Sequence, residues 1–198
     1  MEVSILGRAL TAVLFLQLSI YIFSSLATRP LPKDIDTEYI ETSCNFTLYP
    51  HLCYNSLSSY ANEIKTNPQL LVDTALNVTL VATESTSKLM KNLSKLHDPN
   101  TREGAAWRDC VEEIGDSVYE LQRSLGEMSQ AGGQNSEIVK SDVQTWVSAA
   151  LTDDDTCMDG FDDWGTAVNV EVMKIVRTHV VKIAHLTSNV LALVNNCA

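Results

Sequence analysis

Basic side chains are scarce in this sequence. Its 198 residues include 14 Lys and Arg against 25 Asp and Glu, which gives a formal net charge of −11 at pH 7. Binding to nucleic acid requires a surplus of positive side chains that neutralise phosphates. The composition therefore excludes a nucleic-acid partner and favours a partner protein with a basic surface.

Residues that could form a catalytic or metal centre are also few and scattered. The last two of the four histidines are six positions apart, which places them on separate faces of a helix rather than at the four-residue spacing of a metal pair. The acidic stretch 153–163 fails as an EF-hand loop, because alignment on Gly160 puts Cys157 and Thr166 at ligand positions. Neither a G-x-S-x-G elbow nor a phosphate-binding glycine loop occurs. We therefore expect no enzyme activity, no cofactor and no metal. The four histidines are His51, His97, His179 and His185.

Long apolar runs are absent except at the extreme N-terminus. Arg8 precedes the apolar run 9–23, and Ser25 and Ala27 supply the small residues of a cleavage site. This arrangement predicts a cleaved signal peptide over residues 1–27, with an uncleaved membrane anchor as the alternative. Cleavage removes one base and one acid, so the expected mature chain keeps its charge of −11, is secreted and makes no membrane contact.

Three sequons follow the predicted signal peptide. In a secreted protein each Asn-x-Ser/Thr sequence is a candidate acceptor of a surface glycan. The acceptors are Asn45, Asn77 and Asn92.

Prolines are few, and none of the five interrupts a helical pattern. Apolar residues recur at steps of three and four along 68–96, 107–128, 136–150 and 168–194. No window alternates with period two, so we expect essentially no sheet. These stripes predict an all-α fold, an antiparallel up-down four-helix bundle.

The ends of the predicted bundle helices carry recognisable signals. Asn67 is expected to cap the first helix, with Pro68 at its first position. The second helix should stop before the turn at Gly132-Gly133, and the third should break up in the acidic stretch 153–155.

Ahead of the bundle, residues 36–44 and 50–61 predict two short helices that form an N-terminal helical hairpin. The predicted organisation is a signal peptide over 1–27, a lead over 28–35, the hairpin over 36–66 and the bundle over 67–198. Hairpin and bundle together are expected to form one domain.

Five cysteines in an oxidising compartment predict two disulfides and one spare thiol, with fifteen possible two-bridge connectivities. Cys44 and Cys53 flank the hairpin turn and can form a local bridge. Cys110 lies near the start of the second bundle helix and Cys157 just past the predicted end of the third, which an up-down bundle brings level. The chain-entropy model gives roughly 3 kcal/mol for the short loop and about 4 for the long one. Cys197 is left over, as an idle thiol or a link between chains.

Two segments carry a family resemblance. The run 146–161, WVSAALTDDDTCMDGF, and the hairpin sequence Tyr49-Pro50-x-Leu52-Cys53 resemble the plant invertase and pectin methylesterase inhibitor family. With Cys110, the resemblance covers essentially all of the predicted mature chain. It implies the same fold, the same two disulfides and an inhibitor without a reaction of its own.

The resemblance also bears on the target. Invertase inhibitors of this family typically carry a Pro-Lys-Phe tripeptide, and this sequence has none. We therefore expect a secreted, cell-wall inhibitor of pectin methylesterase that occludes the substrate cleft in a 1:1 complex. An inhibitor of invertase is the first alternative, and an extracellular structural or signalling bundle without an enzyme target is the second.

The expected contact face is acidic. On the second bundle helix, five carboxylates fall within about 40° of one line, which a plain solvated helix face would also explain. The resemblance matches Thr156, Glu112 and Asp116 to positions that contact the esterase. The five aligned carboxylates are Asp109, Glu113, Asp116, Glu120 and Glu127.

Overall fold

The computed structural model describes residues 35–130, 136–162 and 170–197, and within these ranges every regular element is a helix, with no strand. The predicted signal peptide, the lead up to residue 34 and the Gly132-Gly133 turn lie outside the described residues. None of the described helices is long and apolar enough to span a bilayer.

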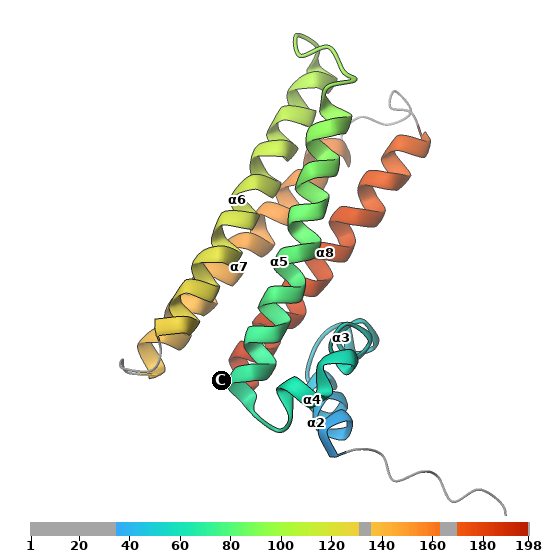
Figure 1. The fold of residues 1–198 in the computed structure, drawn as a ribbon. Helices are drawn as coiled ribbons and strands as arrows, with labels where there is room; N and C mark the ends of the chain where they lie inside the picture. Colours follow the sequence, from blue (N-terminus) through green and yellow to red (C-terminus); the bar gives the residue numbers. More distant parts are fainter. Residues whose placement is uncertain (1–34, 131–135, 163–169, 198) are drawn as a thin grey trace, which may run out of the picture. The chain divides into compact units, whose positions relative to one another are not determined.

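Four long helices form an up-down bundle, as the apolar stripes predict. They are α5 (Pro68–Ser94), α6 (Arg102–Gln130), α7 (Ser136–Asp162) and α8 (Val170–Cys197). Each helix packs against two others, in the cyclic order α5, α6, α7, α8, and consecutive helices run in opposite directions (Figure 1). This is the antiparallel arrangement expected when long helices are joined by short connections.

The first bundle helix starts where the sequence predicts. The Asn67 Oδ1 atom accepts hydrogen bonds from the backbone N–H groups of Gln69 (2.9 Å) and Leu70 (3.1 Å), and Pro68 occupies the first helical turn. The α5–α6 connection is tight, because a Cβ atom on Gly104 would overlap the backbone of Asp98. Glycine is therefore required at this close approach.

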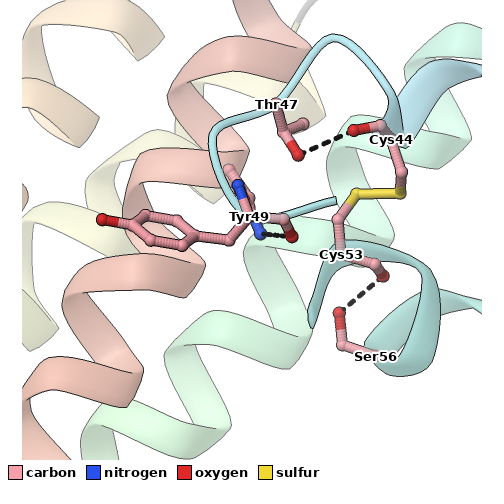
Figure 2. The surroundings of a disulfide bond; sticks show 6 residues. Cys44, Thr47, Tyr49, Cys53 and Ser56 are labelled. Atoms are coloured by element: carbon pink, nitrogen blue, oxygen red, sulfur yellow. Dashed lines mark hydrogen bonds between the residues drawn. A yellow bond between two sulfur atoms is a disulfide. The ribbon is translucent and has the colours of Figure 1, made fainter. Parts of the chain in front are cut away.

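The N-terminal hairpin consists of α2 (Ile35–Cys44), α3 (Pro50–Leu57), the 3₁₀ turn η1 (Ser58–Tyr60) and α4 (Ala61–Ile64). The second predicted helix, 50–61, is thus divided by a 3₁₀ turn, and its last piece extends to Ile64. A disulfide joins Cys44 to Cys53, and the Thr47 hydroxyl donates to the Cys44 carbonyl at 2.8 Å (Figure 2). This covalent and hydrogen-bonded ring fixes a hairpin whose helices are too short to be stable alone.

The hairpin is fastened to the last helix through Tyr49. The Tyr49 N–H donates to Asn189 Oδ1, and Asn189 Nδ2 donates to the Tyr49 carbonyl, both at 3.1 Å. The Tyr49 ring stacks on His185 of α8 with 3.5 Å between ring centroids. We call this pair of hydrogen bonds the Asn189 clasp.

The core contains two apolar clusters. One lies where the hairpin meets the N-terminal part of α5, the end of α6, the start of α7 and the end of α8. The other gathers around Trp107, which stacks on His97 and meets Phe161 edge-on. Several Ser and Thr side chains are also buried, and most of them donate to a carbonyl one turn back on their own helix, as Thr79 does to Ala75 and Thr83 does to Thr79.

The predicted end of the third helix is wrong. Helix α7 continues through Asp153, Asp154 and Asp155 to Asp162, so Cys157 lies within the helix rather than past its end. The reason is that the buried stripe of α7 continues at the same three- and four-residue steps through Asp154, which is accommodated by hydrogen bonds instead of ending the helix. The stripe comprises Val139, Val143, Val147, Ala150, Asp154, Cys157 and Phe161.

Candidate functional site: an acidic ridge between α6 and α7

A disulfide joins the two helices that carry the predicted contact residues. Cys110 of α6 and Cys157 of α7 are bonded, with 4.2 Å between their Cα atoms. This is the pairing that the bundle geometry favours. Thr156, directly before the bridge, is exposed, and its hydroxyl donates to the Thr152 carbonyl at 2.7 Å. The bridge therefore sets Thr156 at the level of the carboxylates that flank Cys110.

The carboxylates of α6 form a ridge that faces α7 along one edge. We define the acidic ridge as Asp109, Glu112, Glu113, Asp116 and Glu120 of α6 together with Asp153 of α7. Asp109, Glu112 and Asp116 are exposed and can meet a partner directly, whereas Glu113, Glu120 and Asp153 are half-buried between the helices. Glu127, the last carboxylate of the predicted line, pairs with Arg123 at 3.5 Å.

Burial and neighbouring carboxylates raise the pKa of Glu113, in the middle of the ridge. Burial raises the pKa of Glu113 most, followed by the negative charges of Asp153, Asp116, Glu112 and Asp109. Since each neighbour that acts on Glu113 is itself a carboxylate, the ridge is a region of strong negative potential.

Glu120 and Asp153 form a carboxyl pair at the end of the ridge that lies toward the C-terminus of α6. The pKa of Glu120 is raised to about 8, first by burial and then by Asp153, and burial also raises the pKa of Asp153. One oxygen of each group, Glu120 Oε2 and Asp153 Oδ2, is buried and accepts no hydrogen bond. Two ionised carboxylates cannot hydrogen-bond to each other, so the pair is satisfied when one of them holds a proton.

Directly behind the ridge lies a carboxyl group that the sequence does not single out. Asp154 is 0% exposed. Its Oδ1 accepts from the Ser117 hydroxyl of α6 at 2.9 Å, and its Oδ2 lies 3.0 Å from the Thr187 hydroxyl oxygen of α8. One side chain of α7 thus links three helices of the bundle.

The hydrogen-bond pattern favours a neutral Asp154. The Thr187 hydroxyl also lies 2.9 Å from the Ile183 carbonyl, yet it has only one proton to donate. A protonated Asp154 donates to Thr187, which then donates to Ile183, and all groups are satisfied. Burial raises the pKa of Asp154 to about 7, although its hydrogen bonds with Ser117 and Thr187 oppose this shift.

The carboxylates of the acidic ridge suit binding through shape and charge. Within residues 35–130, 136–162 and 170–197, no group of three or more His, Cys, Asp or Glu side chains is arranged to hold a metal ion. A preformed surface that is cross-linked by a disulfide and braced from behind by Asp154 keeps its geometry on contact with a partner.

Known proteins are similar to this chain in sequence and in fold. Residues 38–193 match the family described as plant invertase/pectin methylesterase inhibitor. Pectinesterase inhibitor 10 of Arabidopsis thaliana is 54% identical over 161 residues, 80% of this chain and 50% of that protein, so the chain spans half the length of this relative. The 21 kDa protein of Daucus carota is 47% identical over 164 residues, 81% of this chain and 84% of that one. Pectinesterase inhibitor 9 of A. thaliana is 40% identical over 195 residues, 95% and 94% of the two chains.

Solved structures carry the same bundle. A crystal structure of a mutant form of a pectin methylesterase inhibitor from Arabidopsis superposes with a TM-score of 0.63 at 24% identity, over 80% of this chain and 97% of that one. A second, of a pectin methylesterase inhibitor from A. thaliana, gives 0.57 at 23% identity, over 82% and 98%. At these identities the likeness concerns the fold. The sequence match over residues 38–193 establishes that the chain belongs to the plant invertase/pectin methylesterase inhibitor family.

Proposed function

We propose that this protein is a secreted inhibitor of plant pectin methylesterase, without enzyme activity of its own. The observation that carries the proposal is the similarity over nearly the whole chain to a protein named a pectinesterase inhibitor, which covers 95% of this sequence and 94% of that one. The missing Pro-Lys-Phe tripeptide favours the esterase over invertase, because family members that inhibit invertase typically carry it.

The proposed mechanism is non-covalent occlusion of the enzyme's substrate cleft in a 1:1 complex. The exposed ridge residues Asp109, Glu112 and Asp116, with Thr156 beside them, supply a contact surface on two helices joined by a disulfide. Their negative charge steers the encounter with a basic surface and fixes the register of the complex. Little conformational entropy is lost on binding, because the scaffold is already rigid.

Parallel titration against a plant pectin methylesterase and an acid invertase tests the target. We expect stoichiometric loss of esterase activity, with invertase unaffected. Inhibition of invertase alone would assign the protein to the other branch of the family. Full activity of both enzymes would refute the inhibitor proposal and favour an extracellular structural or signalling role.

Substitutions on the ridge test the contact face. Thr156→Arg and the double reversal Glu112→Lys with Asp116→Lys should each weaken inhibition, whereas helicity and Tm should stay nearly unchanged because all three residues are exposed. The matched control is Glu38→Lys, an exposed reversal on α2 of the hairpin. Wild-type inhibition by both ridge variants would place the contact elsewhere.

The location of the protein follows from its predicted processing. Residues 1–27 are expected to direct the chain into the secretory pathway and to be removed, which delivers the inhibitor to the cell wall. N-terminal sequencing of protein recovered from the culture medium of plant cells tests this proposal. Retention of Met1 in membrane fractions would contradict it.

A further inference from the structure

A shallow groove lies between the N-terminal hairpin and α5, away from the α6 carboxylates of the acidic ridge. Its volume is about 340 Å³, near the lower end of the range for small-ligand sites. Tyr60, Val78 and Val81 form its apolar lining, and Glu63 and Asp73 line it with hydrogen-bond acceptors. Val81 is 67% exposed, so it presents apolar surface at the edge of this groove.

One wall of this groove is formed by Asn77, the acceptor of the second sequon. The Asn77 side chain is exposed, and its Nδ2 donates to the Asp73 carbonyl at 2.9 Å and lies 3.3 Å from Asp73 Oδ2. An amide nitrogen carries two hydrogens, so replacement of one by a sugar leaves the other free to keep a bond to Asp73. A carbohydrate attached at this nitrogen begins inside the groove.

We propose that Asn77 carries an N-linked glycan whose first N-acetylglucosamine lies in this groove, over Tyr60 and Val81. A pyranose ring presents C–H groups on its faces and hydroxyls at its edges. The C–H face fits an aromatic ring and a valine, and the hydroxyls and N-acetyl group can donate to Glu63 and Asp73. The groove is open along one side, so the rest of the glycan can extend into solvent.

The attachment step uses the secretory pathway's own donor, a lipid-pyrophosphate-linked oligosaccharide. Asn77 Nδ2 loses a proton and bonds to C1 of the first sugar, while the C1–O bond to the pyrophosphate breaks and the lipid pyrophosphate leaves. Transfer precedes folding, so burial of Thr79 in the finished helix does not obstruct it.

The distribution of sequons agrees with this role. Asn45 lies in the hairpin loop and Asn77 and Asn92 lie on α5, whereas α6, α7 and α8 contain no Asn-x-Ser/Thr sequence. The helices that carry the acidic ridge therefore bear no sequon. A glycan bound over Tyr60 covers apolar surface and stays clear of the proposed contact face.

The test compares glycoforms of the full chain secreted from a yeast that adds oligomannose glycans. Peptide mapping first establishes whether Asn77 is modified. Endoglycosidase H then trims each glycan to one N-acetylglucosamine, and the Tm of this form is compared with that of Asn77→Gln treated in the same way. We expect the trimmed native protein to melt about 2–4 °C higher, the shift typical of about 1 kcal/mol in a chain of this size.

A Tm difference that depends on the groove residues separates the proposal from a general effect of glycosylation on stability. The Tm difference should vanish in a Tyr60→Ala background and shrink in a Val81→Ser background, where the substituted side chain is exposed. Asn92→Gln, at an exposed sequon outside the groove, is the control, and its effect should not depend on Tyr60. An unmodified Asn77 would overturn the proposal. So would a Tm difference in the Tyr60→Ala background equal to that in the native background. Inhibition by Asn77→Gln should equal that of the native protein, so this outcome is independent of the proposed target.

Discussion

Replacing Asp154 with Asn is predicted to remove much of the pH dependence of the free energy of unfolding. The carboxyl group is fully buried and contacts Ser117 and Thr187, on α6 and α8. Its pKa is about 7 in the folded chain, because burial disfavours the charged form, against 3.8 for the exposed group.

The sign follows from proton linkage. Between pH 3.8 and about 7 the folded protein holds a proton on Asp154 that the unfolded chain has released, so a rise in pH favours unfolding. At about 1.4 kcal/mol per pH unit, this interval costs up to roughly 4 kcal/mol. The native protein should therefore be most stable at the acidic end of the window and lose stability as pH approaches 7.

Asparagine reproduces the neutral acid at this position. Its amide oxygen can accept from Ser117, and its amide nitrogen can donate to Thr187, which in turn donates to the Ile183 carbonyl. We expect Asp154→Asn to match the native protein within about 1 kcal/mol at the acidic end, since the hydrogen bonds are conserved. Near neutral pH the variant should be the more stable protein, by several kcal/mol at most.

Urea unfolding followed by far-ultraviolet circular dichroism, at pH values from below the window to above it and with disulfides intact, provides the measurement. Ser117→Ala is the control, because it keeps the carboxyl group and removes a bond that lowers its pKa. The pH dependence of its free energy of unfolding should persist and extend to higher pH. Parallel curves for Asp154→Asn and the native protein would show that Asp154 is ionised in the folded state and would refute the reasoning.

Three further predictions concern other parts of the molecule. Gly104→Ala should destabilise the protein by several kcal/mol, because its Cβ would overlap backbone, whereas Gly115→Ala, with open space around it, should stabilise α6 by about 0.5–1 kcal/mol in the same unfolding assay. Asn189→Ala should cost about 1–3 kcal/mol by leaving the Tyr49 N–H unpaired, while the Tyr49 carbonyl still accepts from the Cys53 N–H at 3.0 Å, and hydrogen exchange at the Tyr49 amide should accelerate. Glu120→Gln should raise Tm near neutral pH but not at acidic pH, since stability held by the protonated carboxyl is lost as pH rises from 4.5, the pKa of the exposed group, to about 8, its pKa in the fold; an equal shift at both would contradict this.

Much of the fold follows from local sequence signals. The four stripes, the Asn67 cap and the two cysteine pairs are readable because each depends on short-range spacing or on the level at which neighbouring helices start and stop. The ends of α5 and α7 are harder to predict from the sequence. Leu96 continues the apolar spacing of α5, yet the helix stops at Ser94 and Leu96 is exposed. Apolar spacing alone cannot tell where burial ends.

The candidate site is only partly readable. The α6 line of carboxylates is visible in the sequence, but burial of Glu113, Glu120 and Asp153 depends on the approach of α7. Asp154 falls in the acidic run that is predicted from the sequence to end the third helix, because aspartate is normally exposed. The signal that identifies it is its position four residues after Ala150 and three before Cys157, on the buried stripe. The Asn189 clasp leaves no such signal, since its partners are 140 residues apart.

That separation has a consequence for the order of events on the ribosome. Cys44 and Cys53 are only nine positions apart, so their bond can form as soon as the hairpin enters an oxidising compartment. The anchor of the hairpin, Asn189, is synthesised 140 residues after Tyr49. The hairpin is therefore closed by its disulfide before it can dock, because docking requires α8. A chain truncated before α8 should expose the Tyr49 side of the hairpin to chaperones.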